Sequence, residues 1–232
     1  MTEITRGVLF VFAKEPVAGR VKTRMVPPLS PQQAADLYAE LLRDVLSVTG
    51  RIALELGLTP TLAVHPPDAA RVLARSAPTE FRVVPQRGAN LGERMARAIR
   101  EAAAGGADRI LLRGSDSPIL DRERIGAVLA SLDEFDLVVS PDLDGGYNLI
   151  GLRRPAPGLF DHPMSTRTAL DDTLANASAL GLRADVQRPT FDIDTAEDLA
   201  LLAAERTGAD SKSIATLCPR TLEFLDTERL WP

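Results

Sequence analysis

Cysteine and histidine are scarce in this chain of 232 residues. The single cysteine, Cys218, excludes an intrachain disulfide and any zinc site built from several thiolates. The two histidines, His65 and His162, count against histidine-rich metal centres and most catalytic triads with a histidine base. Low cysteine usage is typical of a reducing compartment, so we expect a cytoplasmic protein.

Long apolar runs and an excess of positive charge are also missing. No stretch approaches the roughly 20 apolar residues of a membrane-spanning helix. The first residues, MTEITRG, carry an acid and lack the apolar core of a signal peptide. Lys and Arg number 27 against 32 Asp and Glu, a net charge of −5, which is a poor basis for non-specific binding to nucleic acid. We therefore expect neither a membrane nor a nucleic acid as a partner.

Short apolar segments alternate with amphipathic segments along most of the chain. We expect strands at 8–12, 61–64, 81–84, 110–112, 137–139 and 186–191, and one more in DGGYNLIGL. Helices are expected from Pro31, where Ser30 and Gln33 form a capping box, and at 68–76, 94–104, 122–132, 166–180 and after DIDT. This alternation predicts an α/β fold, a three-layer α/β/α sandwich with a mostly parallel mixed sheet. We expect one domain, 1–232, with 209–232 as a peripheral C-terminal segment.

The segment KEPVAGRVKTRM, residues 14–25, gathers cations directly after the first expected strand. Ligands of open α/β sheets bind beyond the carboxyl ends of the strands. Gly19 permits close approach of the backbone, whose N–H groups can cradle an anion. Basic runs are often only solvated surface, but the buried strand before this one favours a phosphate site. Four cations suit a triphosphate, and they are Lys14, Arg20, Lys22 and Arg24.

Aspartates follow two other expected strands. Asp116 lies in RGSDSP, and Asp192 and Asp194 lie in FDIDTAEDL. One or two such carboxylates with substrate phosphates are the ligands that Mg²⁺ commonly uses, although a turn before a helix explains Asp116 equally well. Capping of the next helix explains Thr195 and Asp198. We therefore expect Asp192 as the second metal ligand and Asp194 as a structural neighbour, a choice that the sequence leaves open.

Two further loops combine glycine with polar residues, and a third segment, MSTRT, is polar without glycine. In QRGANLGERM, Gln86 could read the edge of a nucleobase, although an ordinary loop capped by Asn90 fits the composition better. In DGGYNLIGL, a plain hairpin turn competes with a role for Asp144 and Tyr147 beside an acceptor substrate. In MSTRT, the start of a helix would suit a second anion.

Together these motifs resemble a known group of proteins. KEPVAGRVKTRM, GANLGERM, GSDSPIL, DGGYNLIGL, MSTRTAL and DIDTAEDL, in this order, resemble the nucleotide-diphospho-sugar transferase superfamily, which has a glycosyltransferase-A-like fold. The chain looks closest to the bacterial radical-SAM/selenodomain-associated, glycosyltransferase-like transferases. More distantly, it resembles 2-phospho-L-lactate guanylyltransferase and the molybdenum-cofactor guanylyltransferases. The resemblance implies that Lys22, Thr23 and Arg24 bind a nucleoside triphosphate and that Asp116 and Asp192 hold magnesium.

We therefore predict an enzyme, a transferase that depends on Mg²⁺ or Mn²⁺. A small phosphorylated acceptor would attack the α-phosphate of a nucleoside triphosphate and release pyrophosphate. The expected residues are Lys22, Arg24 and Asp116 for catalysis; Lys14, Gly19, Arg20, Lys22, Thr23, Arg24, Gln86 and Gly92 for the nucleotide; Asp144, Gly146, Tyr147, Ser165 and Thr166 for the acceptor; and Asp116 and Asp192 for the metal.

Two other functions compete with nucleotidyl transfer. A glycosyltransferase with a nucleotide-sugar donor would use the same fold and metal. A non-catalytic nucleotide-binding module is less favoured because both aspartates are intact. The four cations favour the triphosphate. The sequence leaves open the acceptor, the nucleobase and the oligomeric state, a homodimer included.

Overall fold

A single mixed sheet forms the centre of the molecule. The structure, a computed structural model, describes residues 7–208 and 211–232. The sheet has the strand order β3-β2-β1-β4-β6-β5-β7. Strand β6 is antiparallel to both of its neighbours and all other pairs are parallel, which confirms the predicted mostly parallel mixed sheet. The strands are β1 (Gly7–Lys14), β2 (Leu58–His65), β3 (Arg82–Pro85), β4 (Arg109–Gly114), β5 (Leu137–Pro141), β6 (Tyr147–Leu152) and β7 (Ala184–Val186).

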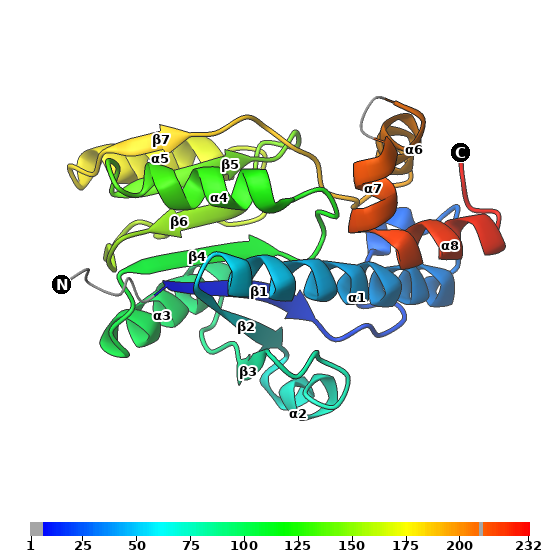
Figure 1. The fold of residues 1–232 in the computed structure, drawn as a ribbon, viewed down its shortest axis with the longest axis horizontal. Coiled ribbons are helices and arrows are strands. Elements are labelled where there is room, and N and C mark those ends of the chain that lie inside the picture. The colour runs from blue at the N-terminus through cyan, green and yellow to red at the C-terminus, as the bar shows by residue number, and fades with distance from the viewer. Residues whose placement is uncertain (1–6, 209–210) are drawn as a thin grey trace.

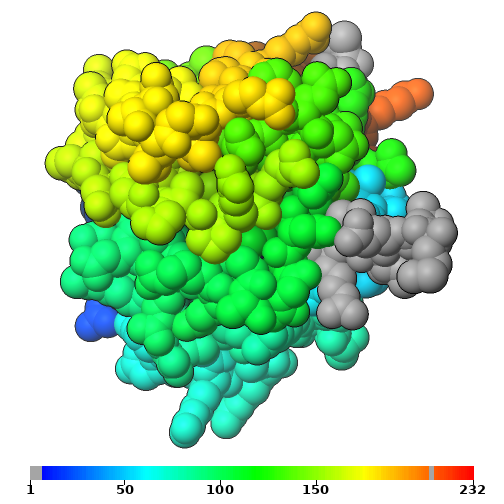
Figure 2. Space-filling model, turned by 90° about the vertical axis from the view of Figure 1, so that its left-hand side faces the viewer, coloured from blue at the N-terminus to red at the C-terminus, as the bar shows by residue number. Residues whose placement is uncertain are grey.

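Helices cover both faces of the sheet, as predicted (Figure 1). One face packs against α1 (Pro31–Glu55) and α4 (Arg122–Ser131). Residues of α6 (Asp198–Thr207), α7 (Ser211–Leu217) and α8 (Pro219–Thr227) join the apolar cluster of α1. The other face packs against α3 (Leu91–Ala104) and α5 (Ala169–Ala179). Figure 2 views the molecule from the end where the parallel strands begin, with α5 in yellow above the green segment of α3. A short helix, α2 (Ala70–Leu73), follows β2.

Local capping explains where two of these helices begin. The Ser30 hydroxyl accepts from Gln33 N at 3.2 Å, and Gln33 Oε1 accepts from Ser30 N at 3.0 Å. This is the predicted capping box of α1. Asn90 Oδ1 accepts from Glu93 N at 2.9 Å, so α3 begins at Leu91, three residues before the expected start at Arg94. Asn90 is therefore a helix cap, as its loop composition suggested.

The prediction of a last core strand at 186–191 is wrong. Strand β7 is a short edge strand that ends at Val186. Pro189 has no N–H to donate to a ladder, so regular pairing with β5 does not continue. The chain then crosses the end of β5, where Thr190 N donates to Pro141 O at 2.9 Å. This crossing carries the two aspartates of FDIDTAEDL over the sheet's edge.

The C-terminal helices pack on α1. Asp44 of α1 is 1% exposed, and its carboxylate accepts hydrogen bonds from Arg220 N, Thr221 N and the Thr221 hydroxyl. Leu222 and Leu225 of α8 are buried in the same apolar cluster as α1. The single domain with a peripheral C-terminal segment stays a prediction. Within the described part of the chain, no helix combines the length and apolar character that crossing a membrane requires.

Candidate active site

A cavity of about 560 Å³ opens at the carboxyl ends of the parallel strands. It is lined by every predicted site residue except Gly19 and Gly92. Gly19 takes a φ of +75° in the turn of the basic loop, a conformation that glycine adopts without strain. Gly92 lies against Phe160, whose carbonyl oxygen would be 2.6 Å from an added Cβ. Close packing therefore accounts for Gly92.

The basic loop brings Lys22 into the middle of this cavity. Lys22 has a left-handed backbone, with φ of 48°, and only 8% of the residue is exposed. Its ammonium lies 5.6 Å from the centroid of the Tyr38 ring and pairs with the carboxylates of Asp116 and Asp194, the latter at 2.9 Å. Arg24 pairs with the other oxygen of Asp194. Two cations of the loop therefore contact the predicted metal-binding region directly.

These ion pairs shift the pKa values of Lys22 and Asp194 in opposite directions. Burial alone would lower the pKa of the Lys22 ammonium, but Asp116 and Asp194 outweigh burial and raise that pKa above its usual range. Burial would raise the pKa of Asp194, yet Lys22 and Arg24 hold that pKa below its ordinary value. Lys22 and Asp194 are therefore both charged near neutral pH.

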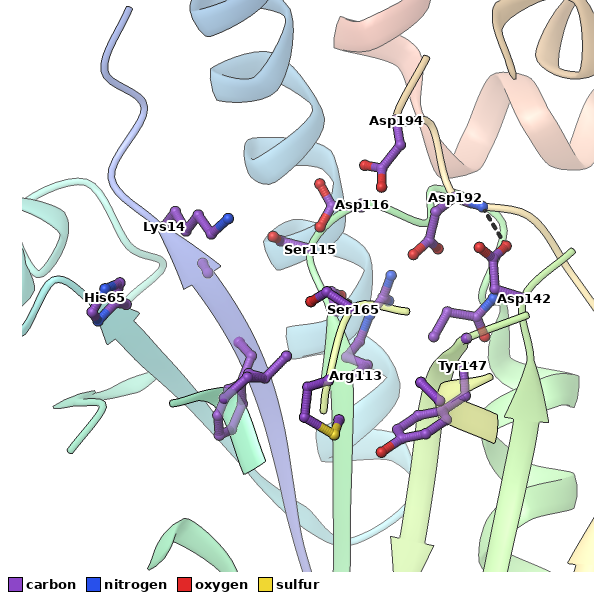
Figure 3. Close-up of a pocket in the computed structure, with 18 of the residues that line it drawn as sticks. Lys14, His65, Arg113, Ser115, Asp116, Asp142, Tyr147, Ser165, Asp192 and Asp194 are labelled. Atoms are coloured by element: carbon purple, nitrogen blue, oxygen red, sulfur yellow. Dashed lines mark hydrogen bonds between the residues drawn. The ribbon is translucent and has the colours of Figure 1, made fainter. Parts of the chain in front are cut away.

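Asp116 and Asp192 lie at the same end of the cavity (Figure 3). The Asp116 carbonyl accepts from Ile193 N at 2.9 Å, which ties the two loops together. Asp192 N donates to Asp142 Oδ1 at 3.0 Å. Burial, followed by the charges of Asp116 and Asp142, raises the pKa of the Asp192 carboxyl well above its usual range. Asp192 thus carries a proton or needs a cation nearby.

The carboxylates of the cavity leave one buried oxygen without a hydrogen-bond donor among the described residues. Asp192 Oδ1 is buried and accepts no hydrogen bond from any residue that the structure describes. Among those same residues, no group of three or more His, Cys, Asp and Glu side chains is placed to hold a metal ion. Mg²⁺ needs only one or two protein carboxylates when substrate phosphates complete its shell. The orphaned oxygen of Asp192 beside Asp116 fits that two-carboxylate arrangement.

Asp198 holds the backbone of its turn, whereas the Asp194 carboxylate pairs with the cations of the basic loop. Asp198 Oδ2 accepts from Asp194 N, Thr195 N and the Thr195 hydroxyl. The expected reach of Asp198 back to Thr195 is therefore present, but the Thr195 side chain does not cap α6, which begins at Asp198. The contact with Asp194 N fixes the turn that points the Asp194 carboxylate at Lys22 and Arg24.

Arg113 and Tyr38 are functional candidates that sequence reasoning missed. Arg113 lies in β4, is 2% exposed, and its Nη1 donates to Thr49 Oγ1 at 2.8 Å. Burial lowers the pKa of Arg113 to about 10, against the opposing charges of Asp192 and Asp116. The Tyr38 hydroxyl accepts from Lys14 N at 2.9 Å and lies 2.8 Å from Ser115 Oγ. An arginine inside the apolar run ILLRG was the one signal available.

The opposite wall of the cavity holds the predicted acceptor residues. Asp144 Oδ1 accepts from Gly146 N at 2.9 Å, within the turn between β5 and β6. An added Cβ on Gly145 would lie 2.1 Å from the Arg167 carbonyl, so this turn packs tightly on the segment that carries Ser165 and Thr166. Leu170 N donates to the Gly145 carbonyl at 3.1 Å, which fixes the same contact. Asp144, Gly146, Ser165 and Thr166 therefore share one wall.

Other groups on this wall have unusual surroundings. Burial, and then the neighbouring Asp144, raise the pKa of Asp142 to about 7. Burial raises the pKa of the Tyr147 phenol to about 12. Asn148 is 1% exposed, with its amide nitrogen donating to Thr190 Oγ1, and its Oδ1 meets no donor in the described chain. This wall is rich in hydrogen-bond acceptors.

Gln86 is placed differently from its predicted role. Its side-chain nitrogen donates to the carbonyls of Ala63 at 2.8 Å and Ala13 at 3.3 Å, and the residue is 6% exposed. These bonds link the ends of β1 and β2. The amide donors of Gln86 thus serve the sheet, and reading of a nucleobase by this side chain stays a prediction.

Comparison with known proteins agrees with this geometry. The chain is 28% identical over 191 residues to phosphoenolpyruvate guanylyltransferase of Chloroflexus aggregans (strain MD-66 / DSM 9485), a match that covers 80% of this chain and 92% of the relative. A crystal structure from Desulfovibrio desulfuricans G20, of a protein assigned as a nucleotide-diphospho-sugar transferase, superposes with a TM-score of 0.81 and 27% identity, covering 96% of this chain and 98% of that one.

A more distant structure shares the fold. The 4-diphosphocytidyl-2C-methyl-D-erythritol synthase of Anaerococcus prevotii DSM 20548 superposes with a TM-score of 0.55 and 10% identity, over 84% of this chain and 94% of that one. The predicted nucleotide-diphospho-sugar transferase fold is therefore confirmed. Residues 41–166 match the family model described as "Uncharacterized protein conserved in bacteria (DUF2064)", and the chain belongs to that family.

Proposed function

We propose that this protein transfers a nucleotidyl group from a nucleoside triphosphate to a small phosphorylated acceptor and releases pyrophosphate. One observation carries the proposal: Lys22 and Arg24 meet Asp116 and Asp194 in a single cavity at the end of the sheet. Cations for phosphates and carboxylates for a divalent ion thus lie within contact of one another. The guanylyltransferase relative supports a transferase of this class.

The basic loop would hold the donor. Lys14, Arg20, Lys22 and Arg24 line the cavity and would neutralise the β- and γ-phosphates, which depart as pyrophosphate. An oxygen of the acceptor's phosphate forms a new bond to the α-phosphorus while the bond from that phosphorus to the bridging oxygen breaks. The electron pair of that bond leaves with pyrophosphate, whose charge the loop stabilises.

Asp116 and Asp192 would hold the divalent ion. When bound, Mg²⁺ or Mn²⁺ supplies charge neutralisation at the α-phosphate. The buried Arg113 guanidinium interacts with both carboxylates, and its positive charge offsets part of their mutual repulsion. The acceptor wall, with Asp144, Gly146, Tyr147, Ser165 and Thr166, would orient the nucleophile, so positioning and electrostatics supply the catalysis.

A coupled pyrophosphate assay tests this function. GTP is the first donor to use because the relative is a guanylyltransferase, and the other nucleoside triphosphates follow. We expect pyrophosphate release only when a phosphorylated acceptor and a divalent ion are both present. A nucleoside triphosphate donor fits the cytoplasmic location predicted from composition.

Glycosyl transfer is the second candidate, because the Desulfovibrio structure is assigned to nucleotide-diphospho-sugar transferases. A glycosyltransferase would release a nucleoside diphosphate or monophosphate from a nucleotide sugar and make no pyrophosphate. A thermal-shift series of nucleotide sugars against nucleoside triphosphates, with and without Mg²⁺, separates the two donors. Sugar transfer without any pyrophosphate would overturn nucleotidyl transfer.

A further inference from the structure

Lys22 sits where two of the acidic side chains converge. Its Nζ contacts Asp116 Oδ1 and lies 2.9 Å from Asp194 Oδ1, and its side chain is only 3% exposed. Asp116 and Asp194 are about one third exposed, so the ammonium lies deeper in the cavity than either carboxylate edge. The ammonium thus occupies the space between carboxylates that face one another.

The charge balance of this region depends on that ammonium. Asp116, Asp192 and Asp194 all line the cavity, and the bond from Ile193 N to the Asp116 carbonyl, at 2.9 Å, holds their two loops together. The Lys22 ammonium pairs with two of these three carboxylates. Lys22 therefore supplies the positive charge that a divalent ion would supply to these oxygens.

From these contacts we infer that Lys22 is an internal counter-ion that occupies the metal position until a triphosphate draws it away. The identity of the ligands rests on the proposed function. In the structure, Asp116 Oδ1 is engaged by the ammonium and not free for a metal. A divalent ion alone must then displace an ion pair, whereas phosphate oxygens offer the ammonium an equivalent partner. The triphosphate should therefore bind before the metal or together with it.

The chemistry of the side chain suits such an exchange. A lysine ammonium is a compact charge on a flexible four-carbon stem, so it can move from carboxylate to phosphate without moving the backbone. Arg24 would likewise exchange its carboxylate partner for a phosphate oxygen, because it also pairs with Asp194. The exchange frees Asp116 and Asp194 at the moment when the α-phosphate reaches the site. The loop would thus couple donor binding to metal binding.

Binding of Mn²⁺ without nucleotide tests the inference. Free Mn²⁺ is followed by electron paramagnetic resonance, and Mg²⁺ binding by calorimetry, for the wild-type chain and Lys22→Met. We expect weak binding by the wild type and at least about tenfold tighter binding by Lys22→Met, because removing a neighbouring like charge favours the cation. Adding Asp192→Asn to Lys22→Met should abolish the gain. The matched control is Arg75→Ala, which removes an exposed cation outside the cavity and should leave Mn²⁺ binding unchanged.

Several outcomes overturn the inference. Wild-type protein that binds Mn²⁺ as tightly as Lys22→Met would exclude a counter-ion role. An equal gain in Arg75→Ala would show only a general effect of charge. Folded Lys22→Met that binds no Mn²⁺ would show that the ammonium and the metal do not share a position.

The wild-type chain gives a second measurement if Lys22→Met does not fold. In EDTA, inorganic triphosphate should bind measurably by calorimetry, while Mn²⁺ without triphosphate should not. The reverse order of binding overturns the inference. Because these readouts need no turnover, an absence of pyrophosphate release in the coupled assay would reject the proposed function and leave the counter-ion role standing.

Discussion

The two walls of the cavity are built in different ways. On the cationic wall, Lys14, Arg20, Lys22 and Arg24 all come from residues 14–25, which are the end of β1 and the loop that follows it. On the acidic wall, the side chains come from the end of β4, the turn between β5 and β6, the start of α5 and the crossing segment after β7. One wall is a local feature of the sequence, and the other exists only when distant segments meet.

The walls also differ in how their charges are satisfied. The cationic wall contributes Lys22 and Arg24, which have direct partners in Asp116 and Asp194. The acidic wall keeps Asp192 and Asp142 in surroundings that raise their pKa values. The fold therefore gathers carboxyl groups whose ionised form a divalent ion would stabilise, and perturbed pKa values of this kind are common at functional sites.

The largest expected effect comes from the acidic wall. Asp192→Asn removes the buried carboxylate proposed to hold the metal, and we expect the rate of pyrophosphate release to fall on the order of 10²–10³-fold. The metal-free variant should melt at the same temperature or higher at pH 8, because a neutral amide replaces a carboxylate that burial disfavours. The exposed Asp161→Asn is the matched control. Unchanged turnover in Asp192→Asn would remove this residue from the site.

The next effect tests the cationic wall. Arg24→Lys keeps the charge but loses the planar fork that can hold two phosphate oxygens, so kcat/KM for the nucleoside triphosphate should fall about tenfold. Arg20→Lys, in the same loop, should lose less, because among the residues that the structure describes Arg24 has a carboxylate partner, Asp194, and Arg20 has none. Steady-state kinetics measure both variants. Equal losses in the two variants would mean that the loop acts as a diffuse positive charge.

The cationic wall was easier to predict from the sequence than the acidic wall, because its residues come from one continuous segment. The capping box of Ser30, the phosphate-binding character predicted for the loop 14–25 and the position of Asp116 after a strand all depend on residues near one another in the chain. Such local patterns are what periodicity and turn chemistry report. Most strand positions and the fold class could therefore be predicted from the sequence.

The rest depends on contacts between distant residues. Tyr38 meets Ser115 across 77 positions, and Arg113 meets Thr49 across 64. No local pattern encodes those pairs, so both the tyrosine and the arginine escaped notice. The expected strand at 186–191 failed for a similar reason. Phe191 is buried in the apolar cluster around α1 and is not paired in the sheet, while Val186 ends the edge strand and is 47% exposed.

A smaller effect should appear in the pH dependence of stability. The folded pKa of Asp142 is raised to about 7, so folded protein binds this proton more tightly than unfolded protein does. The stability that this proton provides is fully present below the unfolded pKa of about 4 and is lost as the pH rises through about 7. Asp142→Asn should therefore melt about 2–4 °C above wild type at pH 8 and close to it at pH 4. Melting curves of metal-free protein at both pH values check the sign, which a constant difference would contradict.

The smallest expected effect asks whether the two walls act separately. Asp144 lies on the acidic wall, is exposed and contacts the turn through Gly146 N. If it positions the acceptor, Asp144→Asn should raise the KM for the acceptor by roughly threefold to tenfold, the cost of weakening one hydrogen bond to a charged group. The dissociation constant of the nucleoside triphosphate should stay unchanged, because the cations that hold it belong to the other wall. Lys14→Ala should give the reverse pattern. If instead Asp144→Asn weakened nucleotide binding as much as acceptor binding, the turn between β5 and β6 would belong to the donor site, and the division of the cavity into two walls would fail.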